Sequence, residues 1–141
     1  MLHSCHVLIV STDPVHREKS DEIFRRLGLQ TLRCGSLMDA RARIEEQTFQ
    51  FVLCSDDLPD CNLRTAVSVL TSATAGAPVI VISHLADWEA YLKALGTGAF
   101  DYLAWPADPG EMERIFRLAL EKTLRRAVHP TRPRDWPASR V

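Results

Sequence analysis

Short apolar runs alternate along this chain with segments of helical periodicity, and this rhythm restricts the fold more than any other feature. Turn or helix-capping residues bound each apolar run, as expected for strands. The third and fourth runs are apolar throughout, which is typical of parallel strands covered on both faces. The rhythm predicts repeated βα units that build a doubly wound parallel sheet, with strands at residues 6–10, 29–34, 51–55, 78–83 and 99–105.

Capping residues and apolar stripes predict a helix after each strand. Asp13-Pro14 opens the first helix and Gly28 closes it, while Ser36 opens the second. The third helix follows the loop at residues 56–61, and the fourth spans about residues 87–95. The chain therefore has the helices that a sheet covered on both faces needs.

The fifth helix has the strongest start signal in the chain. Asp108, Pro109 and Glu111 combine a capping aspartate, a proline at the first helical position and a glutamate that reaches back to the cap. The stripe predicted to face inward consists of Met112, Phe116, Ala119 and Leu120.

Length and composition predict one globular domain. The chain has 141 residues, of which 46% are hydrophobic and 25% are charged. No apolar stretch approaches the roughly 18 residues of a membrane span, and the N-terminal residues have no signal-peptide pattern. We therefore expect a cytoplasmic protein with one domain at residues 1–127 and a flexible tail rich in proline and arginine at residues 128–141.

The net charge of −1 hides an uneven distribution. Asp135 alone opposes the arginines that crowd the C-terminal end of the sequence, namely Arg125, Arg126, Arg132, Arg134 and Arg140. The residues before them are mildly acidic, which argues against binding to nucleic acid.

Residues that usually hold metals or cofactors form no recognisable pattern. The four cysteines, Cys5, Cys34, Cys54 and Cys61, have no Cys-x-x-Cys spacing and suggest small buried side chains rather than disulfides or a zinc site. The histidines have no metal-ligand spacing, and no glycine-rich phosphate loop is present. A serine hydrolase built on Ser55, Ser83 and His84 is disfavoured, because no glycines flank Ser55 as in a nucleophile elbow. We expect no enzyme activity, no metal and no cofactor.

In a doubly wound sheet, ligands bind beyond the carboxyl ends of the strands, at the point where the strand order reverses. These ends carry Ser11, Ser55, Ser83 and Trp105. Functional residues are therefore sought at these positions and among their neighbours.

Four stretches of the sequence are informative together, namely VLIVSTDP, FVLCSDDLPD, PVIVIS and KALGTGAFDYLAWPADPGEMERIFRLALE. They resemble the receiver domain of bacterial response regulators, the CheY-like superfamily of flavodoxin-like (βα)5 folds. The resemblance covers residues 6 to about 124 and is closest in style to the receivers of nitrogen-regulatory transcription factors. It implies a role in two-component phosphorelay signal transduction.

The resemblance also shows where this chain departs from the family. Active receivers have an acidic pair that holds Mg²⁺ at the end of strand one, and these positions hold Ser11 and Thr12. The phospho-accepting aspartate, four residues before Pro59, is replaced by Ser55. The lysine after strand five is replaced by Trp105, which has no cation to offer an acyl phosphate.

Two family positions are kept, and one neighbour is altered. Ser83 matches the hydroxyl residue at the end of strand four, and Tyr102 matches the aromatic residue that couples the site to the partner face. His84 stands where the family has a small residue, and it is expected to crowd the site. The resemblance therefore implies a degenerate pseudo-receiver that needs no Mg²⁺ and signals by protein–protein interaction without phosphorylation.

One alternative is a phosphoaccepting receiver in which Asp56 is the acceptor and Asp13 and Asp57 hold the metal. A slip of one residue along a strand turns the side chain to the opposite face, so Asp56 is not expected to point where Ser55 points. Aspartates in the turn around Pro59 are also ordinary turn residues, and Asp13 before Pro14 is a typical helix cap.

The resemblance implies a partner face on the fourth helix, last strand and fifth helix, which binds another protein or a second copy. Aromatic and aliphatic residues predicted there are Trp88, Tyr91, Trp105, Ile115 and Leu118. Trp105 has a second interpretation, in which it fills the space left by the altered site. Two further alternatives are a scaffold that presents the arginines and Trp136 of the tail to an acidic partner, and a redox sensor at Cys54.

Overall fold

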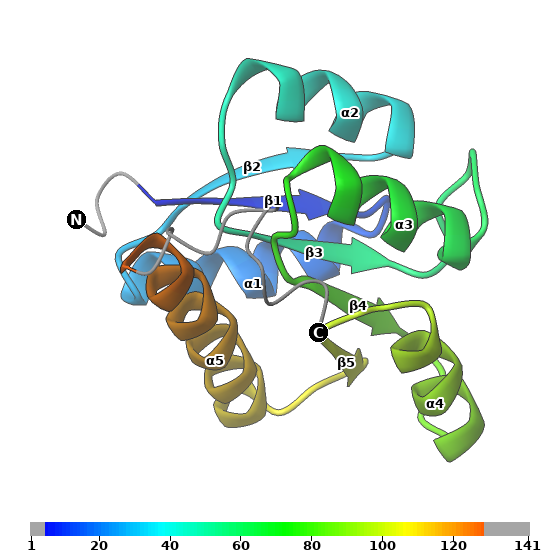
Figure 1. The fold of residues 1–141 in the computed structure, drawn as a ribbon. Coiled ribbons are helices and arrows are strands. Elements are labelled where there is room, and N and C mark those ends of the chain that lie inside the picture. The colour runs from blue at the N-terminus through cyan, green and yellow to red at the C-terminus, as the bar shows by residue number, and fades with distance from the viewer. Residues whose placement is uncertain (1–4, 129–141) are drawn as a thin grey trace, which may run out of the picture.

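The computed structural model describes residues 5–128, whose arrangement is shown in Figure 1. The strands are β1 (His6–Val10), β2 (Gln30–Cys34), β3 (Phe51–Ser55), β4 (Val79–Ser83) and β5 (Asp101–Ala104). The helices are α1 (Pro14–Arg26), α2 (Leu37–Glu46), α3 (Leu63–Ala73), α4 (Trp88–Gly96) and α5 (Pro109–Val128). Helix α5 includes Val128, and the rest of the predicted tail lies outside the described residues.

The strands form one parallel sheet in the order β2-β1-β3-β4-β5, which confirms the predicted doubly wound architecture. The strand order reverses between β1 and β3, because the chain first moves outward to β2 and then crosses back. Helices α1 and α5 lie together on one face of the sheet, and α2 and α3 cover the other (Figure 1). Side chains of α4 pack into the core on the α2 and α3 face.

Three phenylalanines join α1, β3 and α5 in the core. The ring centroids of Phe24 and Phe116 are 4.4 Å apart, and Phe51 lies 5.8 Å from Phe24 and 6.1 Å from Phe116. All three side chains are fully buried. Such contacts stabilise a fold by roughly 0.5–1.5 kcal/mol each beyond the burial of their area, so this cluster holds α5 against the sheet.

The prediction that Ile115 lies on the partner face, outside the core stripe of α5, is wrong. Ile115 is only 1% exposed and belongs to the core cluster between the sheet, α1 and α5. It follows Met112 by three residues, a spacing that places both side chains on one helix face. Leu118 is 41% exposed, in agreement with its predicted position outside the stripe.

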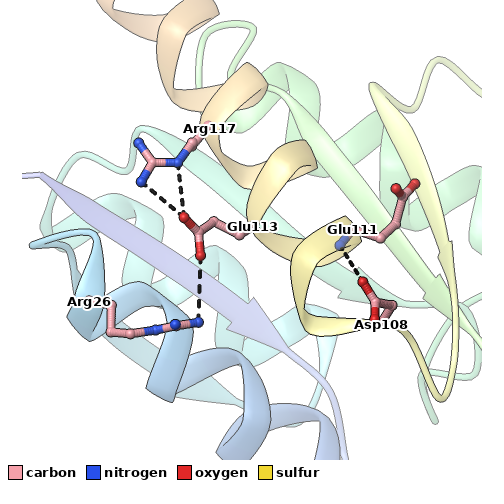
Figure 2. A network of polar contacts seen from close by, with 5 residues as sticks. All are labelled: Arg26, Asp108, Glu111, Glu113 and Arg117. Atoms are coloured by element: carbon pink, nitrogen blue, oxygen red, sulfur yellow. Dashed lines mark hydrogen bonds and ion pairs between the residues drawn. The ribbon is translucent and has the colours of Figure 1, made fainter.

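The helices begin at the capping residues indicated by the sequence. Asp13 and Ser36 accept backbone N–H groups at the starts of α1 and α2, and Asp108 accepts the Glu111 N–H at 3.1 Å (Figure 2). The predicted reach of the Glu111 side chain back to the cap is not observed. Its carboxylate instead accepts two hydrogen bonds from Arg114, at 3.2 and 2.8 Å.

An ion-pair network joins the exposed edges of α1 and α5. The Glu113 carboxylate accepts from Nε and Nη2 of Arg117 at 3.1 and 2.9 Å and lies 3.5 Å from Nη2 of Arg26 (Figure 2). Both arginines are exposed, so solvent screens the network and its contribution to stability is modest. Packing of the buried rings, rather than these charges, keeps α1 and α5 together.

None of the helices within residues 5–128 combines the length and the apolar character needed to cross a membrane.

Candidate functional site

Three buried serines form the floor of the site at the carboxyl edge of the sheet. Ser55 and Ser83 end β3 and β4, and Ser11 follows β1 directly. Because the three strands are neighbours and parallel, their ends meet at one edge, as the sequence predicted. Thr12 follows Ser11 and is exposed. The floor of the site therefore consists of neutral hydroxyl groups.

Each floor serine is hydrogen-bonded to a residue two positions later in its own loop. The Ser11 hydroxyl accepts the Asp13 N–H at 3.1 Å, and the Ser83 hydroxyl accepts the Leu85 N–H at 3.0 Å. The Ser55 hydroxyl donates to the Asp57 carboxylate. These short-range bonds satisfy the buried hydroxyls locally and stabilise the loop that follows each strand.

An ion pair connects the two loops on either side of the site. His84 Nε2, after β4, lies 3.3 Å from an Asp13 carboxylate oxygen, after β1, and carries a positive charge when the imidazole is protonated. The second oxygen of Asp13 caps α1 by accepting the Val15 N–H at 2.9 Å. His84, which the sequence suggested would crowd the site, thus contacts the opposite loop.

The acidic residues after β3 have different surroundings. The Asp56 N–H donates to Ile82 at 3.0 Å and extends the pairing of β3 with β4. The Asp56 charge contributes to raising the pKa values of Cys54 and Tyr102, both of which pack in the cluster on the α2 and α3 face. The carboxylate that contacts Ser55 is that of Asp57. Within residues 5–128, no three His, Cys, Asp or Glu side chains converge as a metal site.

Asp60 has a role that the sequence did not indicate. Its two carboxylate oxygens accept the N–H groups of Leu37 and Met38, each at 3.0 Å, and so cap α2 from the β3–α3 loop. These two bonds lower the pKa of Asp60, because they favour the charged form. Asp60 therefore fixes the loop after Ser55 to the start of α2. A cap from a distant segment leaves no local sequence signal.

Cys54 lies directly before Ser55 and is fully buried. Burial is the main cause that strongly raises the pKa of its thiol, and the neighbouring Cys61 and Cys34 add to the effect. A thiol in this setting stays protonated and has little nucleophilic character. The surroundings therefore do not support the redox-sensor alternative.

Tyr102 connects the site with the surface of α4. Its hydroxyl donates to the Leu85 carbonyl, and the Leu85 N–H donates to Ser83. Burial is the main cause that raises the pKa of Tyr102, opposed by a hydrogen bond with Ser83. The edge of its ring meets Tyr91 at a centroid distance of 6.0 Å. A continuous chain of contacts thus runs from the floor of the site to α4.

Trp105 is separated from the aromatic residues of α4, which contradicts its predicted place on the partner face. Successive side chains alternate between the faces of a strand, so Trp105 follows Leu103 to the α1 and α5 side, opposite Tyr102. It packs against that core cluster and lines a groove of about 330 Å³ with Val15 and Met112. Trp105 remains linked to the site through its N–H, which donates to the Ser83 carbonyl at 2.6 Å.

Trp88 and Tyr91 form a stacked pair on α4. Their ring centroids are 5.1 Å apart with an interplanar angle of 24°, and Trp88 is 70% exposed. They line a groove of about 570 Å³ between α4, β5 and the start of α5. Of the five residues predicted for the partner face, Trp88, Tyr91 and Leu118 are at least partly exposed, whereas Ile115 is buried and Trp105 packs on the α1 and α5 side.

Comparison with known proteins identifies the family. The model of the response regulator receiver domain matches residues 7–117, and this chain therefore belongs to the receiver-domain family. Response regulator protein PilR of Pseudomonas aeruginosa is 28% identical over 113 residues, which cover 80% of this chain and 25% of PilR. The chain thus spans about a quarter of the length of this relative.

Solved structures agree with this fold. A putative response regulator from Chloroflexus aurantiacus superposes with a TM-score of 0.77 at 24% identity, covering 83% of this chain and 98% of that chain. The receiver domain of sensor histidine kinase PA1611 from Pseudomonas aeruginosa, which has a magnesium ion in its active-site cleft, gives a TM-score of 0.72 at 23% identity. That match covers 83% of this chain and 98% of the PA1611 chain. The solved structures establish the CheY-like fold, and the match to the receiver-domain model establishes membership of a family of signal-transduction domains.

Proposed function

We propose that this chain is a receiver domain that signals without phosphorylation, through contact with another protein or with a second copy. The observation that carries the proposal is Ser55 at the end of β3, buried and hydrogen-bonded to Asp57. Attack on a phosphohistidine needs an anionic oxygen at this position. A serine hydroxyl is neutral, and the base in contact with Ser55 is the Asp57 carboxylate, which would have to take its proton.

The donor atoms around the floor do not suit Mg²⁺, which prefers carboxylate oxygens in a near-octahedral arrangement. Ser11 and Thr12 offer only neutral hydroxyl groups at the end of β1. One oxygen of Asp13 caps α1 and the other lies against His84, and Asp57 accepts from Ser55. A phosphorylation mechanism that depends on Mg²⁺ therefore finds no suitable ligands here.

The side chains that would surround a phosphoryl group are also unsuitable. Trp105 cannot provide the charge-assisted hydrogen bond of a lysine, and it packs on the α1 and α5 side of the sheet. The contact between His84 and Asp13 joins the loops through which a phosphoryl group would enter. These features support a domain that is neither an enzyme nor a phosphoryl acceptor.

Without a phosphoryl group, the contacts from Ser83 through Leu85 to Tyr102 stay in one arrangement. We place partner binding at the other end of these contacts, on α4, β5 and α5. Exposed aromatic residues such as Trp88 are typical anchors of protein interfaces. The acidic character of the residues before the tail argues against nucleic acid as the partner.

Phosphorylation is tested with ¹⁵N-labelled full-length chain, to which Mg²⁺ and BeF₃⁻ or acetyl phosphate are added. A receiver with the complete acidic site is treated in parallel as the positive control. We expect amide resonances and intact mass to stay unchanged in this chain and to change in the control. A saturable shift that disappears in the Asp56→Asn variant would refute the proposal and establish Asp56 as the acceptor.

The partner face is tested with the Trp88→Ala, Tyr91→Ala, Leu118→Ala triple variant, in sedimentation velocity and pull-down experiments. The matched control is Met38→Ala, which removes a 75% exposed side chain from α2, away from the proposed face. We expect the triple variant to lose association and the control to retain it. Equal association of the two variants, with folded circular dichroism spectra, would contradict this assignment.

A further inference from the structure

The groove between α4, β5 and α5 has an aromatic wall. Trp88 stacks on Tyr91, whose ring meets the edge of Tyr102, so three rings follow one another from the surface to the sheet. Trp88 is 70% exposed although its ring is large and apolar. An exposed tryptophan provides area for a stacked guanidinium group, another aromatic ring or a proline.

The rim of this groove is acidic. Four carboxylates and one guanidinium line it, which gives a net charge of −3; they belong to Asp87, Asp101, Asp108, Glu111 and Arg114. Arg114 binds both oxygens of Glu111, so these two charges largely neutralise each other. The three aspartates each accept one backbone N–H, at 2.7, 2.8 and 3.1 Å. A cationic segment with apolar side chains complements this groove.

The chain itself contains such a segment, HPTRPRDWPASRV at residues 129–141. Its three arginines oppose the single Asp135, so its net charge is +2 with neutral histidine. Trp136 and the three prolines supply flat apolar surfaces, and the prolines reduce the conformational entropy that is lost on binding. Charge and side-chain type therefore both match the groove.

The segment is long enough to reach the groove from the end of its own α5. Arg114 precedes Val128 by 14 residues, or about 21 Å along a helix that rises about 1.5 Å per residue. An extended chain covers about 3.3 Å per residue, so Arg134 lies up to about 20 Å and Trp136 up to about 26 Å beyond Val128. Residues 136–140 can therefore lie beside Arg114 and Glu111 if the segment runs back along α5.

We propose that residues 129–141 bind in the groove of the same chain, with arginine side chains at the aspartates and an arginine or Trp136 stacked on Trp88. This inference rests on the proposed function in one respect, because it names an occupant of the face assigned to partner binding. The segment thus competes with an external partner, which must displace it.

The test compares ¹⁵N spectra of the full-length chain with those of the full-length Arg134→Ser, Trp136→Ser, Arg140→Ser variant. We expect differences at the Trp88 indole and at the amides of Asp101–Ala104, which do not change on tenfold dilution. A synthetic peptide of residues 129–141, added to the variant, shifts the same resonances back in a saturable way. Salt weakens its binding, because the contact is partly between exposed charges.

Two groove variants test whether the peptide binds at this groove. In the background of the tail variant, Trp88→Ala and Asp101→Asn are each expected to weaken peptide binding about tenfold, the equivalent of about 1.4 kcal/mol. The matched control is Glu45→Gln with Glu46→Gln on α2, which removes two carboxylates from a different groove and leaves peptide binding unchanged. Neither Trp88 nor Asp101 is a core residue, so both groove variants are expected to fold.

Identical groove resonances in the wild-type chain and the tail variant would overturn the inference. Differences confined to residues around Trp105, or differences that vanish on dilution because a second copy supplies the segment, would overturn it as well. A shift with BeF₃⁻ would refute the proposed function and leave this inference standing. Groove resonances that are unchanged in the tail variant would refute this inference and leave the proposed function standing.

Discussion

Replacing Ile115 by alanine should destabilise the domain far more than the same truncation at Leu118, three residues later on α5. Ile115 is 1% exposed and Leu118 is 41% exposed. Alanine at position 115 removes three carbon atoms, each worth about 0.8 kcal/mol of transfer free energy, or about 2.4 kcal/mol together. The remaining cavity adds about 1 kcal/mol, so the free energy of unfolding should fall by about 3–4 kcal/mol. At Leu118 the loss should stay below about 1 kcal/mol.

Urea unfolding followed by circular dichroism measures both changes. With a slope of about 2 kcal/mol per molar urea, the midpoint should fall by about 1.5–2 M for Ile115→Ala and by less than about 0.5 M for Leu118→Ala. Ile115→Val, expected to cost about 0.5–1.5 kcal/mol, keeps the comparison possible if the alanine variant does not fold. Equal midpoint shifts for the two alanine variants, or a larger one at Leu118, would refute the placement of Ile115 in the core.

Three further predictions follow from individual contacts. Asp60→Asn should lower stability near pH 7, and this difference should shrink on acidification. The reason is that a carboxylate with a lowered pKa stabilises the fold above its unfolded value of 3.8 and loses that effect as pH falls through the folded value. Urea midpoints across about pH 3–7 test this, and a constant difference would contradict the capping role. A thiol reagent should modify half-buried Cys61 before Cys54 in the native chain, as peptide mass mapping can show, and early labelling of Cys54 would contradict its burial. Glu113→Gln should cost less than about 1 kcal/mol in the same urea assay, because its arginine partners are exposed, and a loss above about 2 kcal/mol would show that the network matters more than the core packing.

Much of the fold was predictable because strand burial leaves a strong local signal. The apolar runs at β3 and β4 are buried on both faces, so neither contains a polar residue before its final serine. The shared edge of Ser11, Ser55 and Ser83 follows from parallel strand topology alone. The burial of Ile115 could also have been predicted from the sequence. The spacing of one apolar helix face is shared by Met112, Ile115, Phe116, Ala119 and Leu120.

Contacts between loops were not predictable in the same way. Asp60 caps α2 across 23 positions of sequence, and His84 meets Asp13 from the far side of the site. Such contacts depend on the paths of two loops, about which neither apolar periodicity nor residue type carries information. The side taken by Trp105 follows from strand alternation, but only once the exact end of β5 is known.

The hydrogen bond between Ser55 and Asp57 has a consequence for the evolution of this domain. A single mutation of Ser55 to aspartate would place a second carboxylate beside Asp57, where like charges repel and no lysine lies at position 105 to compensate them. Residues in direct contact do not contribute additively, so the effect of an aspartate at position 55 depends on which residues stand at positions 57 and 105. A return to an acidic acceptor is therefore expected to need coupled changes at positions 55 and 105 rather than one substitution.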